Sequence, residues 1–164
     1  MLCTLLFGCL GHPVAVKPVE DFDVTRYLGT WYEIARLDHS FERDLVNVTA
    51  GYSLRDDGGI DVTNRGFLPQ ESRWKEAQGK AYFVNAPDEG YLKVSFFGPF
   101  YGSYVIFELD HKDYQYAFVS GPDTAYLWLL ARTPHVDQSL IDRFIDRAGE
   151  AGFDTASLIF PSQE

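Results

Sequence analysis

The sequence predicts an all-β protein: an eight-stranded antiparallel up-and-down β-barrel, with one C-terminal α-helix packed outside it and a short final strand. Two observations support this fold class. Eight strand-like runs of alternating apolar residues follow one another through short, turn-rich connections, a pattern that favours a meander closing into a barrel. The apolar period then changes to helical spacing after Thr133 and Pro134.

Each strand is predicted from its apolar alternation and from the turn residues that bound it. Asp57-Gly58, between the second and third runs, is a strong hairpin signal. Residues 85–90 and 110–113 read as further turns, and residues 98–102 are expected to break the strand pattern. The predicted strands span residues 31–37, 46–54, 60–68, 74–84, 91–97, 103–109, 114–120 and 126–132.

The helix is predicted from one apolar stripe, formed by Leu140, Ile141, Phe144, Ile145 and Ala148. Its N-cap is expected at Asp137 and its end near Gly149 or Gly152. A single stripe implies packing against the outside of the barrel. Residues 157–160 are expected to form the final strand and to pair with the edge of the first.

Length and composition place this chain among single-domain proteins that do not bind nucleic acid. Its 164 residues suit one domain, residues 21–164, preceded by a leader and tether, residues 1–20. A net charge of −10 argues against nucleic acid and against an electrostatic grip on anionic lipid surfaces. No run after residue 10 is long and apolar enough to span a bilayer.

Neither a catalytic motif nor a metal or cofactor motif is evident. The sequence has no Gly-x-Ser-x-Gly elbow. Its four histidines fall in the tail or in predicted loops without metal-ligand spacing. We therefore expect no catalytic residue, no metal site and no cofactor.

A glycine followed two residues later by a tryptophan, Gly29-Thr30-Trp31, opens the first predicted strand. The glycine allows close backbone approach, and the ring of Trp31 can plug one end of a barrel and accept a cation, for which Arg132 is the candidate. This arrangement resembles the signature of the lipocalin family. Residues 23–36 are similar to the opening of its apolipoprotein D-like branch, and residues 93–102 and 121–134 resemble the bacterial outer-membrane members.

The first ten residues are apolar, and Leu6-Phe7-Gly8-Cys9 resembles a bacterial lipoprotein cleavage box. The resemblance implies a lipid anchor on Cys9. The stretch from His12 to Val19 has two prolines and little periodicity, and it is expected to form a tether. Phe7 is bulkier than such a box usually carries, and no Lys or Arg precedes the run. Three alternatives stay open: a start upstream of Met1, a lost export signal, or an unmodified apolar tail.

Strand alternation assigns the side chains that face the barrel interior, once Trp31 is taken as inward. Glu33 and Ala35 then face inward and Tyr32 and Ile34 outward, and Arg132 places Leu130, Trp128 and Tyr126 on the inner face. The family resemblance implies pocket positions at Tyr52, Asn64, Phe96, Tyr104 and Trp128. Alternation adds Val62, Ile106 and Glu108 inside, with Phe107 and Leu109 outside, and Phe83 and Tyr116 are also expected inside. An ordinary filled core is the alternative to a ligand pocket.

The resemblance implies storage or transport of a lipid, either a lysophospholipid or a fatty acid, in a barrel anchored to the periplasmic face of a bacterial outer membrane. Because Glu33 and Glu108 are expected inside, the charged head group should stay at the mouth, near the hydroxyls of Tyr52 and Tyr104. Two other functions remain open. A lipid-modifying enzyme would use Glu33 or Glu108, and a structural envelope protein could form a homodimer through residues 96–101.

Overall fold

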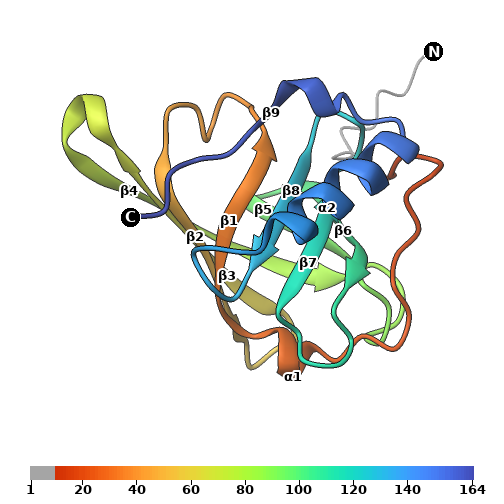
Figure 1. Ribbon diagram of the computed structural model, residues 1–164. Helices are drawn as coiled ribbons and strands as arrows, with labels where there is room; N and C mark the ends of the chain where they lie inside the picture. The colour runs from red at the N-terminus through yellow and green to blue at the C-terminus, as the bar shows by residue number, and fades with distance from the viewer. Residues whose placement is uncertain (1–9) are drawn as a thin grey trace, which may run out of the picture.

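The computed structural model describes residues 10–164, which form one closed β-barrel with a helix on its outer wall (Figure 1). A short helix, α1 (Val24–Tyr27), precedes the barrel, and α2 (Gln138–Glu150) follows it. The strands are β1 (Gly29–Leu37), β2 (Val46–Leu54), β3 (Ile60–Leu68), β4 (Arg73–Phe83), β5 (Tyr91–Phe97), β6 (Phe100–Leu109), β7 (Tyr116–Ser120), β8 (Leu127–Ala131) and β9 (Leu158–Ile159). Two single 3₁₀ turns lie at Pro69–Glu71 and Thr155–Ser157.

The strands pair in chain order, and the additional pairing of β1 with β2 closes the sheet. Every pairing between neighbours is antiparallel. The short strand β9 pairs with β1 through Ile159 and Leu158. The predicted up-and-down barrel with a final edge strand is therefore confirmed. One difference is local: β6 already begins at Phe100, which pairs with Phe97, so the predicted interruption at residues 98–102 shrinks to a tight turn.

The antiparallel order gives the barrel two distinct ends. We call the end with the β1–β2, β3–β4, β5–β6 and β7–β8 connections the mouth, and the end beside α1 the floor (Figure 1). No helix within residues 10–164 is long and apolar enough to cross a membrane.

Helix α2 covers one outer face of the barrel, as its apolar stripe predicts. Phe144 and Ala148 are fully buried, and the ring of Phe144 lies 5.0 Å from that of Phe118 on β7. Asp137 occupies the N-cap position, although its side chain makes no capping hydrogen bond. The turn after the helix uses Gly152 with a φ of +90°, a conformation that glycine adopts without strain.

Two β-bulges reset the inside–outside alternation that the sequence predicts. In β1 the register with β8 shifts between Glu33 and Ala35, so Ile34 and Ala35 both face the helix. In β6 it shifts between Ile106 and Glu108, so Glu108 turns outward. Three orientation predictions are therefore wrong: Ala35 and Glu108 face outward, and Leu109 belongs to the inner cluster.

Tyr116 is a further correction, because it lies on the outer face and not inside the barrel. It pairs with Ala131, packs against the cluster beneath α2, and accepts a hydrogen bond of 2.8 Å from Arg143 Nη1. The neighbouring β7 residues Ala117 and Val119 point inward in its place.

The chain before α1 runs along the barrel. Val16 is fully buried, and the backbone of Val19 bonds on one side to Ile106 and on the other to Gly90, each at 2.9 Å. Within the predicted tether, Val16 and Val19 therefore pack against the barrel. Cys3 and Cys9, with the predicted lipid anchor, lie outside the described residues.

Candidate ligand-binding cavity

The inner face of the barrel encloses a cavity of about 540 Å³. Its wall is mainly apolar and aromatic, and this volume is within the usual range for small-molecule sites. A depression of about 630 Å³ also lies outside the barrel, between Gln115 and Arg143, but it is more open to solvent. The interior cavity is therefore the stronger candidate for a ligand site.

Seven predicted pocket residues line this cavity: Glu33, Tyr52, Val62, Asn64, Phe96, Tyr104 and Trp128. Ile106 is fully buried in the inner cluster and does not reach the cavity surface, and Phe83 packs against Phe22, with ring centroids 6.1 Å apart. Ala35 and Tyr116, as described above, lie outside the barrel.

Sequence reasoning missed the loop residues at the mouth. Phe41, Glu42 and Leu45 of the β1–β2 loop line the cavity, as do Phe97 and Phe100 at the β5–β6 turn. Alternation could have identified the strand positions Ala81 and Val94, which also line the wall. The β1–β2 loop has no periodic pattern, so its fold over the cavity left no comparable signal.

The floor is closed by Trp31 and Arg132, as the sequence predicts. The guanidinium carbon of Arg132 lies 3.9 Å from the centroid of the fully buried Trp31 ring. Arg132 also donates hydrogen bonds to three backbone carbonyls, those of Arg26 at 2.8 Å, Thr30 at 3.1 Å and Tyr114 at 3.2 Å.

Gly29 lies directly against this arginine. Its φ is +98°, and a Cβ added there would sit 3.4 Å from Arg132 Nη1. Both the backbone conformation and the nearby guanidinium therefore favour glycine at this position.

Three tyrosine hydroxyls meet above this plug. The Tyr104 hydroxyl lies 2.7 Å from that of Tyr27 and 2.9 Å from that of Tyr52. The Tyr27 ring packs on Trp31 with centroids 4.7 Å apart, which places the hydroxyls toward the floor. The prediction that Tyr52 and Tyr104 hydroxyls lie at the mouth is therefore wrong. Burial raises the pKa of all three groups above the ordinary tyrosine value.

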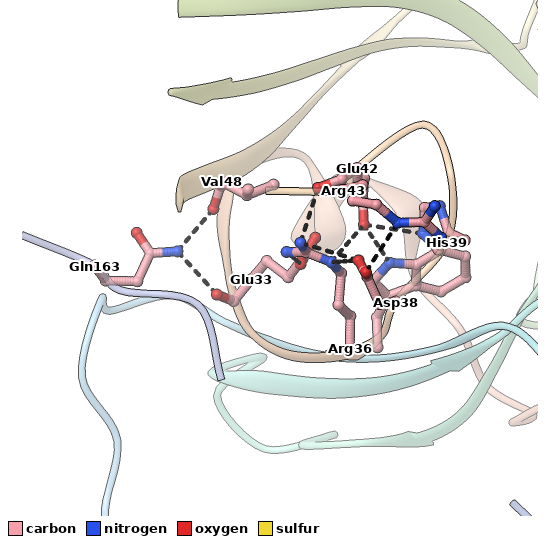
Figure 2. A network of polar contacts seen from close by, with 9 residues as sticks. Glu33, Arg36, Asp38, His39, Glu42, Arg43, Val48 and Gln163 are labelled. Carbon is pink, nitrogen blue, oxygen red and sulfur yellow. Dashed lines mark hydrogen bonds and ion pairs between the residues drawn. The ribbon is translucent and has the colours of Figure 1, made fainter. Parts of the chain in front are cut away.

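A buried ionic network lies on the cavity wall nearer the mouth (Figure 2). Arg36, only 1% exposed, donates from Nη1 to Glu33 Oε1 and from Nη2 to the carbonyl of Glu42, each at 2.8 Å. The Glu42 carboxylate accepts from Trp128 Nε1 at 3.2 Å and lies 3.0 Å from His39 Nε2. Arg36 therefore compensates Glu33 inside the barrel, and this buried carboxyl has a guanidinium beside it.

Glu33 and Glu42, the two buried carboxyls of this network, differ in their protonation. Burial, followed by the charge of Glu42, raises the pKa of Glu33 well above its usual value. Burial also opposes ionisation of Glu42, but its contacts with His39, Trp128 and Arg36 outweigh that effect and lower its pKa. The wall therefore favours one protonated and one ionised carboxyl.

The C-terminal segment ties the barrel together beside this network (Figure 2). The buried amide of Gln163 donates to the carbonyl of Glu33 on β1 at 2.8 Å and to that of Val48 on β2 at 2.9 Å. The β1–β2 ladder extends only from Gly29 to Tyr32 along β1. Gln163 therefore bridges the two strands where their own pairing has ended.

The mouth carries exposed aromatic rings and charges of both signs. Phe41, Phe97 and Phe100 are 58%, 80% and 54% exposed. Arg65 and Lys75 line this part of the cavity together with Glu42 and Glu76. No group of three or more metal-ligating side chains occurs among residues 10–164.

The chain is similar to a known protein family and to several known proteins. The family model described as a lipocalin-like domain matches residues 22–163. The outer membrane lipoprotein Blc of Vibrio cholerae is 62% identical, with 100% of this chain and 96% of that protein covered. The protein of the same name in Escherichia coli K12 is 52% identical, with 92% of this chain and 85% of that protein covered. Mouse apolipoprotein D is 29% identical, with 88% of this chain and 78% of that protein covered.

Solved structures support the same fold. Insecticyanin from the tobacco hornworm Manduca sexta superposes with a TM-score of 0.71 at 22% identity, covering 93% of this chain and 86% of that one. Lobster apocrustacyanin A1 gives a TM-score of 0.67 at 19% identity, with 93% of both chains covered. At these identities the likeness concerns the barrel alone.

Proposed function

This chain belongs to the lipocalin family, and from that premise we propose that it binds a single-chain lipid, a lysophospholipid or a fatty acid, in its barrel. The enclosed apolar cavity of about 540 Å³ is the observation that carries this proposal. Burial of an acyl chain there removes apolar surface from water, which is favourable by about 0.8 kcal/mol per methylene. Storage or transport of such a lipid for envelope maintenance is the corresponding role.

The head group is proposed to stay at the mouth. The acyl chain faces the apolar wall, whereas the mouth offers Arg65 and Lys75 for a phosphate and Glu42 and Glu76 for an ammonium group. A zwitterionic head can satisfy both signs, but a bare carboxylate can satisfy only one. The net charge of −10 also gives an anionic ligand no attraction from the overall field.

This reasoning gives a direct experiment. We expect a lysophosphatidylethanolamine to bind more tightly than a free fatty acid of equal chain length. Titrations below the critical micelle concentration, followed by tryptophan fluorescence, compare the two. Trp128→Ala should weaken both by a similar factor, because Trp128 lies along the chain path. Equal or tighter binding of the fatty acid would contradict the head-group assignment.

The proposed location is the periplasmic face of a bacterial outer membrane, with a lipid anchor on Cys9. Two relatives that align over most of this chain carry the name outer membrane lipoprotein, and the sequence around Cys9 resembles a lipoprotein cleavage box. Mass spectrometry of solvent-extracted protein, expressed with its full leader, reports the bound lipid and any Cys9 modification together.

A lipid-modifying enzyme is the less favoured alternative. Of its two candidate acids, Glu108 faces α2 and pairs with Arg143 at 3.0 Å, and Glu33 is bonded to Arg36. Turnover of a bound lipid, as opposed to stoichiometric release, would favour the enzyme. A structural role through a homodimer is a separate proposal, supported by the exposed rings of Phe97 and Phe100, and analytical ultracentrifugation tests it.

A further inference from the structure

The three hydroxyls at the floor, those of Tyr27, Tyr52 and Tyr104, form a short hydrogen-bonded chain that we call the tyrosine triad. They come from separate parts of the chain: α1, β2 and β6. All three residues line the cavity. Tyr104 is the central member, since its hydroxyl contacts both of the others, at 2.7 Å and 2.9 Å.

The triad has more protons than internal hydrogen bonds. Each hydroxyl carries one O–H, and burial raises the pKa of each, so all three stay protonated near neutral pH. Two oxygen–oxygen contacts use two of the three protons, whichever hydroxyl donates in each. Within residues 10–164 no protein acceptor is bonded to the third. One O–H is therefore always left over, and the cavity is where it can find a partner.

This spare donor discriminates between ligands that reach the floor. A methyl-ended chain would displace water from the triad and leave a buried O–H without an acceptor, which is costly. A chain ending in an oxygen would accept that hydrogen bond. We propose that the floor of the cavity is a subsite for an uncharged oxygen, a hydroxyl or a carbonyl, at the buried end of the ligand.

The absence of a facing charge explains why the oxygen should be uncharged. Arg132 is the nearest cation at the floor, but it lies across the Trp31 ring, is bonded to three backbone carbonyls, and is not part of the cavity wall. The wall cations Arg65 and Lys75 belong to the mouth. A carboxylate at the triad would therefore be desolvated without an ion pair. The ligand class is a single-chain lipid oxygenated at its tail, an inference that rests on the proposed lipid-binding function.

The test compares matched lipids on the full chain. The probes are lysophosphatidylethanolamines whose acyl chains end in a hydroxyl or in a methyl group, in a series of equal chain lengths. At the length that reaches the triad, the hydroxyl-ended lipid should bind about tenfold more tightly, the discrimination expected from one satisfied buried donor. Shorter chains should show the reverse order, because their polar end would meet only the apolar wall.

Variants of the triad give a distinctive pattern. Tyr27→Phe or Tyr52→Phe leaves two hydroxyls with one bond between them, and Tyr104→Phe leaves two hydroxyls that share no bond. At least one donor stays spare in every case, so each single change should keep the preference. The triple variant Tyr27→Phe, Tyr52→Phe and Tyr104→Phe removes every donor and should abolish it. Tyr32→Phe is the matched control, because Tyr32 lies on the outer face.

The outcomes separate this inference from the function on which it rests. If neither lipid binds, the proposed function fails and the inference fails with it. If both bind equally at every length, the inference alone is overturned. Circular dichroism checks the fold of the triple variant. If that variant does not fold, the comparison of the two lipids on the unsubstituted protein still decides the question.

Discussion

The closure of the barrel floor by Arg132 can be tested by removing its side chain. Arg132→Ala deletes three hydrogen bonds to backbone carbonyls and the cation–π contact with Trp31 at 3.9 Å. A cation–π pair contributes about 0.5–2 kcal/mol and each net hydrogen bond about 1 kcal/mol. Because the guanidinium is partly exposed, solvent takes over some of these bonds. We therefore expect a total loss of about 2–4 kcal/mol.

Thermal and urea unfolding measure this loss. For a domain of this size, a loss of about 2–4 kcal/mol should lower Tm by about 4–16 °C. Arg132→Lys should fall between the wild type and the alanine variant, because lysine keeps the charge but cannot present the planar fork that reaches three carbonyls. A double-mutant cycle with Trp31→Phe isolates the ring contact from the hydrogen bonds.

Ligand affinity is the measurement that could refute this reasoning. Arg132 does not line the cavity, so the Kd for a lysophospholipid should change little while stability falls. Loss of binding at unchanged stability would show that the arginine contacts the ligand, and the orientation of the whole barrel floor would then be wrong.

Three further predictions concern the anchor, the C-terminal tie and the buried acid. Cys9→Ser should shift the protein from the membrane fraction to the soluble periplasmic fraction, and unchanged fractionation would argue against the anchor. Gln163→Leu should destabilise the fold by about 1–3 kcal/mol in urea unfolding, because it leaves two buried carbonyls without their hydrogen-bond donor. Glu164→Gln, at an exposed neighbouring position, is the control. Since the pKa of Glu33 is raised above its usual 4.5, its stabilising contribution is present at low pH and lost as pH rises. Glu33→Gln should flatten that decline, and an unchanged pH profile would contradict the assignment.

The strand order and the closed end could be predicted from the sequence because both leave local or motif-level signals. Alternation and turn residues such as Asp57-Gly58 mark each hairpin. Gly29 and Trp31 on one side and Arg132 on the other provide the closure. The helix was equally predictable, because the apolar stripe that contains Phe144 and Ala148 follows the period of an α-helix.

The orientation of individual side chains was less predictable, because a β-bulge has no reliable mark in the sequence. One extra residue inverts every later assignment in the strand. Ile34 is that residue in β1 and Phe107 in β6, so Ala35 and Glu108 were assigned to the wrong face. The position of the triad was missed for another reason: which end of the barrel a hydroxyl approaches depends on tilt and tertiary packing.

The bulge in β1 resolves a conflict that strict alternation would create. Without it, Arg36 would face outward with Ile34, into the apolar contact with α2 around Phe144, and Glu33 would be buried without a cation. A buried guanidinium without a partner, or a buried carboxyl without a hydrogen-bond donor, is strongly unfavourable. The extra residue turns Arg36 inward to Glu33 while Ile34 and Ala35 both pack beneath the helix. A single local irregularity therefore satisfies the outer apolar layer and the charged wall of the cavity together, which a regular strand of the same sequence could not do.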